Sequence, residues 1–179
     1  MTIKIKEIKF KFNNSNVIKA KALLKKYPKK FSISAIIPLL HLAQDQSGGW
    51  LNKSAIEFIS KFLNIPLIKV YEVASFYHMF NLKKVGKYCI HVCTTTPCWL
   101  KGSDVILKNL EKNFNIKVGN TTSDNKVTLK EIECLGACID APLIKINNDY
   151  FDSLNSDDLQ TLIDQIKSGK KIHLTKHNA

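Results

Sequence analysis

The sequence predicts a protein of mixed class, α followed by α/β: a small N-terminal helical bundle and then a small α/β domain. Three observations predict this. Apolar residues recur at helical spacing through much of residues 17–80, β-favouring runs appear after residue 84, and all five cysteines lie within residues 89–138. We therefore expect a helical region over residues 1–84, a cysteine-bearing domain over 85–169 and a flexible tail over 170–179.

Four helices joined by tight turns are expected in the first part, as in a small bundle. They cover approximately residues 17–25, 35–47, 55–63 and 66–80. Pro28 stops the first helix, and a Gly-Gly pair ends the second. Ser54 is the expected cap of the third, and Pro66 suits the first turn of the fourth.

The second part is expected to alternate strands and helices. A strand over residues 87–92 leads into a helix over 99–114, a second strand covers 127–134, and a hairpin turns at about 147–149. A last helix opens at Ser156 and closes at Gly169. The strand–helix–strand order makes the first two strands parallel, so their carboxyl ends meet at one edge of the sheet.

The composition excludes some classes of function. The net charge is +12, yet every basic residue is lysine and the lysines are spread along the chain, which indicates a solvated surface rather than nucleic-acid binding. No apolar run approaches the roughly 20 residues of a membrane-spanning helix, so direct membrane insertion is not expected. The first residues resemble neither a signal peptide nor a transit peptide, which favours a reducing, cytoplasm-like compartment where disulfides are disfavoured.

Four cysteines occur in two close pairs, in CTTTPC and CLGAC. Cys93 and Cys98 follow the first expected strand, and Cys134 and Cys138 follow the second. Because both strands end at the same edge, the two pairs are expected to converge there as a metal site. The spacings are looser than the usual zinc C-x2-C, and two open pairs, one for each iron, favour a 2Fe–2S cluster. Structural zinc, two disulfides and reactive thiols are the alternatives.

The residues beside these cysteines suit an anionic cluster. The start of the helix after Cys93 offers free N–H groups and the positive end of a helix dipole. Gly136 permits a positive φ and close approach of the backbone to sulfur. Cys89 lies inside the first strand, and we expect it to be a buried free thiol and not a ligand.

Four motifs in order, GGWL, VYEVASFYHMFN, CTTTPCWLKGSD and EIECLGACIDAP, resemble the thioredoxin-like 2Fe–2S subunit of respiratory complex I, the NADH:quinone oxidoreductase. The resemblance runs from about residue 15 to residue 168. It implies a thioredoxin-like 2Fe–2S ferredoxin domain after the helical region, with one cluster on Cys93, Cys98, Cys134 and Cys138. Lys69 and Lys101 stand where arginine is common in that family, and His78 stands where a small polar residue is frequent.

The resemblance also implies a place in an assembly. The cluster is expected to exchange single electrons with the flavin of a partner subunit that binds FMN and NADH, and the large iron–sulfur subunit is a second partner. The chain carries no G-x-G-x-x-G motif, no P-loop and no candidate nucleophile–base pair, so it is expected to hold no complete active site of its own. The complex would place it on the inner face of the cytoplasmic membrane, or on the matrix side in a mitochondrion.

Other functions stay open at this point. The equivalent diaphorase subunit of an NAD-linked hydrogenase or formate dehydrogenase would carry the same motifs. A zinc-binding interaction protein without redox activity, or a free thioredoxin-like ferredoxin, would use the same cysteines. A cluster of Phe76, Tyr77, Met79 and Phe80 at the end of the fourth helix is expected either to pack in the core or to dock a partner.

Overall fold

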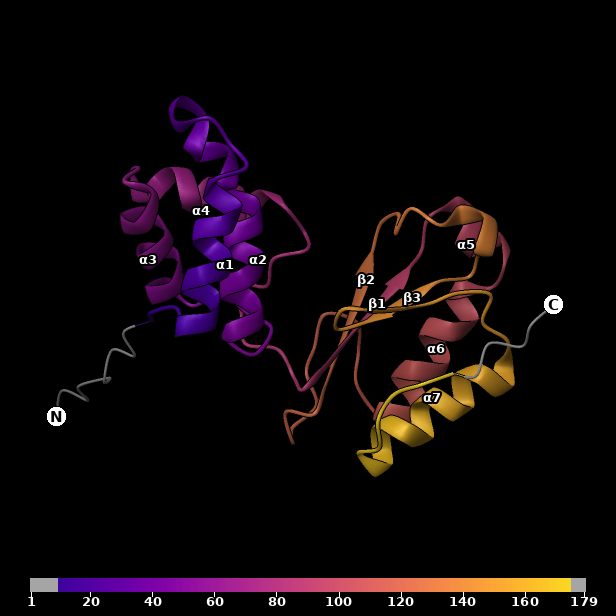
Figure 1. Cartoon of the computed structure of the whole chain (residues 1–179). Coiled ribbons are helices and arrows are strands. Elements are labelled where there is room, and N and C mark those ends of the chain that lie inside the picture. The colour runs from indigo at the N-terminus through magenta and orange to yellow at the C-terminus, as the bar shows by residue number, and fades with distance from the viewer. Residues whose placement is uncertain (1–9, 175–179) are drawn as a thin grey trace, which may run out of the picture. The chain divides into compact units, whose positions relative to one another are not determined.

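The computed structural model describes residues 10–174, and the chain divides between Lys84 and Val85 into two compact units (Figure 1). The division falls where strand-like sequence first appears. Each unit has a hydrophobic core of its own, so each is described by itself. None of the helices in residues 10–174 is long and apolar enough to span a bilayer.

The first unit is helical, as the sequence predicted. Its elements are α1 (Asn14–Leu24), the 3-10 helix η1 (Lys29–Ala35), α2 (Ile36–Gln46), α3 (Lys53–Leu63) and α4 (Leu67–Phe76). Asn52 caps α3 by accepting the N–H of Ala55 at 2.8 Å, in place of the expected Ser54. The fourth helix ends at Phe76, four residues before the expected end, and Phe80 is buried in the core.

The core of this unit is built from the inward faces of the helices. Leu39 and Leu40 of α2, Ile59 of α3 and Val70 of α4 are fully buried. The Gln44 side chain ties the segment after α4 to α2, because it donates to the Met79 carbonyl at 3.0 Å and accepts the Asn81 N–H at 2.7 Å. The expected aromatic cluster is therefore split: Phe80 packs in the core and Phe76 is exposed.

The second unit is a four-stranded mixed sheet with helices on one face. Its elements are β1 (Tyr88–Cys93), α5 (Thr96–Leu100), α6 (Ser103–Phe114), β2 (Val127–Ile132), η2 (Cys138–Asp140), β3 (Ile144–Ile146), β4 (Asp149–Phe151) and α7 (Ser156–Ser168). The strand order is β2-β1-β3-β4, with β1 and β2 parallel and the other pairs antiparallel. In register, Cys93 lies opposite Ile132, so both strands end at the same edge.

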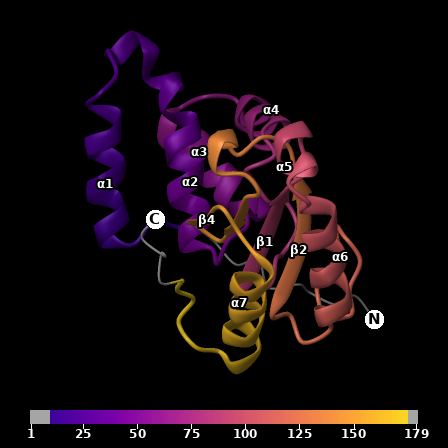
Figure 2. The ribbon, with the colours of Figure 1, turned by 90° about the vertical axis from the view of Figure 1, so that its right-hand side faces the viewer.

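Helices α6 and α7 pack side by side on one face of this sheet (Figure 2). Ile106 and Leu110 of α6 and Leu162 and Ile163 of α7 meet the buried face of the strands, which includes Ile90 of β1. The helix expected over 99–114 is two helices, because Gly102 adopts φ 87° and breaks the chain between α5 and α6. The expected hairpin is confirmed as β3 and β4, with Asn147 at φ 56° in its turn.

The expected flexible tail lies partly outside the described residues. Residues 170–174 are described, and they pack onto the second unit. Gln165 of α7 donates from its side chain to the His173 carbonyl and accepts the His173 N–H, both at 2.8 Å. Ile172 and Leu174 contact the sheet core. Residues 175–179 lie outside the described part of the chain.

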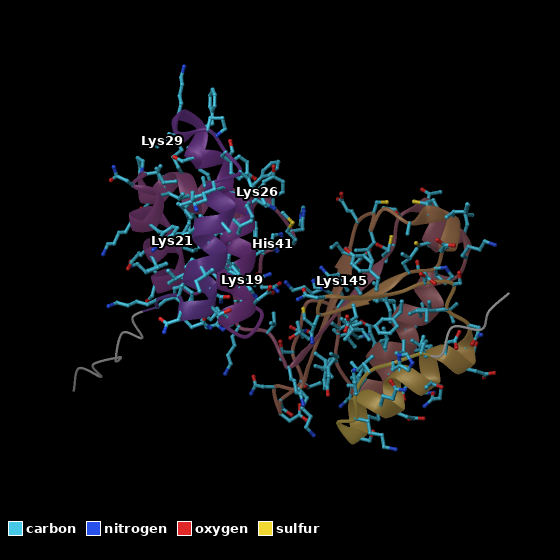
Figure 3. All side chains as sticks on the ribbon, in the orientation of Figure 1. Lys19, Lys21, Lys26, Lys29, His41 and Lys145 are labelled. Atoms are coloured by element: carbon cyan, nitrogen blue, oxygen red, sulfur yellow. The ribbon has the colours of Figure 1, made fainter. Side chains whose placement is uncertain are left out.

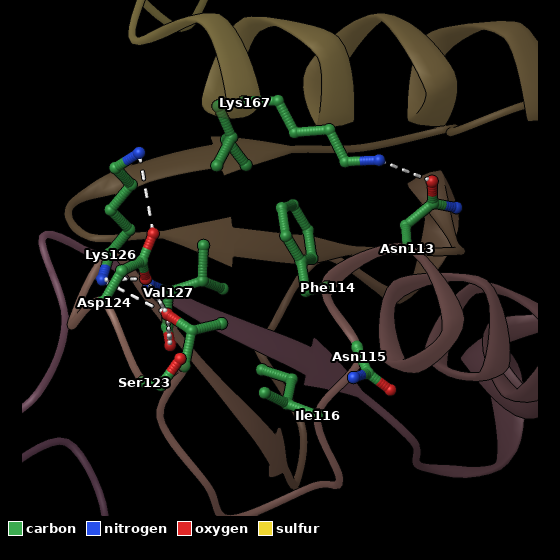
Figure 4. Close-up of a pocket in the computed structure, with 11 residues that line it drawn as sticks. Asn113, Phe114, Asn115, Ile116, Ser123, Asp124, Lys126, Val127 and Lys167 are labelled. Atoms are coloured by element: carbon green, nitrogen blue, oxygen red, sulfur yellow. Dashed lines mark hydrogen bonds and ion pairs between the residues drawn. The ribbon is translucent and has the colours of Figure 1, made fainter.

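A cavity of about 420 Å³ lies at the end of the sheet where β2 begins, with Val127 in its wall (Figure 4). Lys167 connects α7 to α6 across this cavity. Its Nζ donates to Asn113 Oδ1 at 3.0 Å and lies 5.9 Å from the centre of the Phe114 ring. Asp124 accepts from the Thr122 hydroxyl at 2.6 Å and lies 3.5 Å from Lys126 Nζ. These contacts hold the loop before β2 and join the two helices.

Candidate metal centre

The four paired cysteines lie where the parallel strands end. Cys93 is the last residue of β1, and Cys98 follows in α5. Cys134 comes two residues after the end of β2, and Cys138 begins η2. The strand register and the connection from β1 to α5 thus bring the two pairs to one edge of the sheet, as the sequence predicted.

The first pair is enclosed. Cys93 and Cys98 are buried with Leu143 in a small cluster of their own, against which Leu135 and Ala137 pack. The Cys93 N–H donates to the Leu143 carbonyl at 3.1 Å, which fixes the end of β1 beside the chain that leads into β3. Cys93 Sγ lies 3.3 Å from Thr95 Oγ1. Pro97 in the first turn of α5 fixes the backbone just before Cys98.

The second pair is exposed and lies on a tight loop. The Sγ atoms of Cys134 and Cys138 are 3.5 Å apart. Gly136 between them adopts φ 87°, and its N–H donates to Cys134 Sγ at 3.3 Å. Only glycine takes this conformation readily, so the expectation for Gly136 is confirmed. The peptide between Ala141 and Pro142 is cis where the loop turns into β3.

The thiols affect one another's ionisation. Burial acts to raise the pKa of Cys93, but hydrogen bonds from Thr95 and from the Leu135 backbone outweigh it, so the net pKa is lowered. Burial and the neighbouring Cys93 raise the pKa of Cys98 to about 11. The pKa of Cys138 is also raised, and the largest cause is the hydrogen bond between Cys138 and Cys134. Four thiolates so close repel one another unless cations offset their charge.

These four residues fit a two-iron cluster. A 2Fe–2S cluster takes two thiolates on each iron, and the donor set here is two pairs of cysteines. The Gly136 N–H aimed at Cys134 sulfur supplies a donor of the kind that stabilises a negatively charged cluster.

Cys89 is separate from the four, as expected. It is 4% exposed in β1, and its Sγ lies 3.8 Å from the Nε2 of His91 on the same face of the strand. Burial raises the pKa of Cys89 to about 11 and lowers the pKa of His91 to about 4. Both side chains are therefore neutral near pH 7, and Cys89 is not a reactive thiolate.

Sequence reasoning missed the apolar rim, which we define as Trp99, Leu100, Val105 and Ile139. These four side chains are 58%, 72%, 57% and 94% exposed; Trp99 and Leu100 follow Cys98 in α5, Val105 lies in α6, and Ile139 follows Cys138 in η2. Exposed aromatic and large aliphatic side chains next to functional residues are of the kind that protein interfaces bury.

The fold and the cysteines define a thioredoxin-like ferredoxin. The family model for thioredoxin-like [2Fe-2S] ferredoxins matches residues 20–167. The chain belongs to this family, whose fold carries one 2Fe–2S cluster, as the resemblance implied.

Two relatives are similar over nearly the whole chain. One is an NADH-quinone oxidoreductase subunit from Rickettsia prowazekii (strain Madrid E), which is 53% identical over 92% of this chain and 93% of that protein. The other is the mitochondrial NADH dehydrogenase [ubiquinone] flavoprotein 2 of Dictyostelium discoideum, which is 48% identical over 90% of this chain and 65% of that protein.

A solved structure shares the fold. A chain of the NAD+-reducing [NiFe]-hydrogenase in the air-oxidized state superposes with a TM-score of 0.65 and 24% identity. The match covers 75% of this chain and 23% of that chain. At this identity the likeness concerns the fold alone.

Proposed function

We propose that this chain is the 2Fe–2S electron-transfer subunit of an NADH:quinone oxidoreductase. In this proposal Cys93, Cys98, Cys134 and Cys138 hold the cluster, two thiolates for each iron. The observation that carries it is the convergence of the two cysteine pairs at the carboxyl ends of β1 and β2. The two relatives, 53% and 48% identical to this chain, carry the names of that enzyme's subunits, which supports the assignment of this chain to such a complex.

The chain's part in the reaction is one-electron transfer. A bound cluster supplies a centre that gains and loses one electron, and the residues around it set its potential and its access to water. Gly136 and Thr95 offset negative charge at the sulfurs, and Leu143 and Leu135 exclude water from the first pair. Hydride chemistry belongs to a partner subunit that binds FMN and NADH, and a large iron–sulfur subunit is the second partner.

The apolar rim supports docking beside the cluster. An electron carrier must bring its centre close to that of its partner, so the surface next to the cysteines is the one that has to be covered. Trp99, Leu100 and Ile139 are the kind of residues that interfaces bury. We place the contact with the flavin-binding subunit there, on the inner face of the membrane that carries the complex.

The test is low-temperature EPR of the anaerobically purified chain before and after dithionite, with iron, sulfide and zinc assayed on the same sample. A signal from one unpaired electron on reduction, with about two iron and two sulfide ions per chain, is the expected result. A sample that holds zinc and no sulfide, even after reconstitution with iron and sulfide, would make the cysteines a structural zinc site and refute the redox function.

A second assay separates the enzyme class from its alternatives. The cell extract that contains the chain is resolved by size, and the fraction that holds it is assayed with NADH. Reduction of a quinone analogue supports the proposed complex. Hydrogen- or formate-linked reduction of NAD in that same fraction would assign the chain to an NAD-linked hydrogenase or formate dehydrogenase.

A further inference from the structure

The charge of this protein is divided unequally between its two units. Residues 10–84 carry twelve lysines and three acidic residues, a formal charge of +9, whereas residues 85–174 carry eleven of each, a formal charge of zero. The two units hold nearly equal numbers of lysines, so the difference arises from the shortage of acidic residues in the helical unit. The excess in the helical unit is therefore a property of its surface.

Six of the twelve lysines lie within residues 19–30, a departure from the even spread of lysines along the rest of the chain. We call this stretch the lysine segment: Lys19, Lys21, Lys25, Lys26, Lys29 and Lys30. All six side chains are exposed, and the sequence from residue 10 to residue 44 contains no acidic residue. None of the ion pairs within residues 10–174 involves them. Figure 3 shows Lys19, Lys21, Lys26 and Lys29 along α1 and the turn after it.

Helical spacing places Lys21 and the C-cap residue Lys25 on the outward side of α1. Asn16 and Ala20, four residues apart, are the buried residues of this helix. Lys21 and Lys25 are also four residues apart, on the opposite side, and like charges at that spacing destabilise a helix. A lysine in the last turn of a helix interacts favourably with the helix dipole. Lys29 and Lys30 lie beyond the end of α1, so stabilisation of this helix does not explain why they are lysines.

Apolar side chains are exposed among the lysines. Ile18 is 70% exposed, Phe31 is 53% exposed and Ile33 is 43% exposed. Lys30 Nζ lies 5.7 Å from the centre of the Phe31 ring, a cation–π contact that holds the aromatic ring beside the charge. Exposed lysine charges steer and orient a protein partner of opposite charge. The exposed Phe31 adds an aromatic side chain of the kind that interfaces bury.

We propose that the lysine segment docks an acidic face of another protein subunit of the same complex. This rests on the proposed function, because it takes the partners from that assignment. A lipid surface fits less well, since a helix lying on a bilayer presents a wide apolar face, whereas Ile18 is the one exposed large apolar side chain of α1. Nucleic acid fits less well, because arginine, which grips phosphate with two donors, is absent.

The test measures binding of the full chain, with its cluster, to the purified flavin-binding subunit and to the large iron–sulfur subunit. The variant is Lys25→Glu with Lys26→Glu, and the matched control is Lys112→Glu with Lys170→Glu in the second unit. For the subunit that the lysine segment contacts, the Kd of the variant should be at least tenfold higher than that of the unsubstituted chain. The Kd of the control should differ from it by less than twofold. Raising KCl should weaken binding of the unsubstituted chain more than of the variant.

A milder variant protects the test from a folding artefact. Lys19→Ala with Lys29→Ala removes two charges without adding new ones, and it should weaken binding in the same direction while the far-ultraviolet circular dichroism is unchanged. Equal binding by the unsubstituted chain and by both variants would overturn the proposal and leave the proposed function intact. Failure of the unsubstituted chain to bind either subunit would refute the partner assignment and this proposal together.

Two further probes decide between classes of partner. Vesicles of phosphatidylglycerol and phosphatidylcholine and a random-sequence duplex DNA are titrated with the same variants. Binding of either probe through Lys25 and Lys26, with subunit binding unaffected, would reassign the lysine segment to a lipid or a nucleic-acid surface. Weak binding of both probes, without dependence on these lysines, is the expected result.

Discussion

At the residue scale, the cysteines are distinguished by their positions and not by their chemistry. Cys93 and Cys98 are as buried as Cys89, yet the first two face another pair at the sheet edge and Cys89 faces His91 inside the sheet. Burial alone would have grouped these three thiols together. The strand ending at Cys93 and the chain reversal at Gly136 separate the ligand candidates from the core thiol.

Replacing one cysteine of the exposed pair tests this distinction. Cys134→Ser removes a thiolate and leaves the Gly136 N–H without its sulfur acceptor, so the purified chain should lose most of its iron and its reduced EPR signal. Cys89→Ser is the matched control, and it should keep about two iron ions per chain. Retention of the full signal in the Cys134 variant, or its loss in the Cys89 variant alone, would contradict the ligand assignment.

His91 should make the stability of the second unit depend on pH. Its folded-state pKa is lowered to about 4, chiefly by burial and then by Lys130 and Lys145, below the ordinary value of 6.5. The unfolded chain therefore binds the extra proton first, and stability is fully present above the unfolded pKa and lost as pH falls toward the folded one. Between about pH 7 and about pH 5 the loss should be about 2 kcal/mol.

Urea unfolding followed by circular dichroism at these two pH values measures the effect. Glutamine does not titrate in this range. Between the two pH values the free energy of unfolding of the His91→Gln variant should therefore fall by about 2 kcal/mol less than that of the unsubstituted chain. An equal pH dependence in the two proteins would show that His91 is not the group responsible.

At the element scale, helix α7 depends on its first turn. Asn155 accepts the N–H groups of Asp157 and Asp158 at 2.9 and 2.8 Å, and Asp158 accepts the Asn155 N–H in return. Asn155→Ala removes the cap and should lower the free energy of unfolding by about 1 kcal/mol. Lys170→Ala, at an exposed residue beyond the other end, should change it by less than about 0.5 kcal/mol in the same denaturant titration.

Local patterns predicted the elements well and their ends less well. The sequence predicted β1 and β2 from runs of β-favouring residues, the β3–β4 hairpin from its turn residues, and α7 from its apolar spacing and its polar first turn. It did not predict the break between α5 and α6, because the apolar spacing continues across Gly102 and only the backbone reveals its positive φ. The cap of α7 was expected at Ser156, and the neighbouring Asn155 took the role.

The candidate site was predictable for a similar reason. Parallel neighbouring strands bring distant cysteine pairs together, so spacing and strand order were sufficient to place Cys93, Cys98, Cys134 and Cys138 at one edge. The apolar rim was not predictable, because tryptophan and isoleucine are residue types that a sequence pattern assigns to the core, and nothing local marks Trp99 and Ile139 as exposed. Their exposure depends on how α5 and η2 lie on the sheet, which is a non-local property.

At the scale of the whole molecule, the two separate cores predict that a core substitution in one unit destabilises that unit and leaves the other folded. Leu39 is fully buried in the helical unit, and Leu129 of β2 is fully buried in the second unit. Leu39→Ala leaves a cavity and should cost about 2–5 kcal/mol in the first unit. Because no residue of that core belongs to the other, the loss should not pass directly to the packing around the cysteines.

Hydrogen exchange followed by mass spectrometry locates the damage. Leu39→Ala should raise exchange in peptides from α2, α3 and α4, while peptides from β1 and β2 keep their protection and the chain keeps its iron. Leu129→Ala should do the reverse, with faster exchange across the sheet and partial loss of iron. Faster exchange throughout the chain in both variants would mean that the two units unfold as one, and the 2Fe–2S site would then depend on the helical unit for its stability.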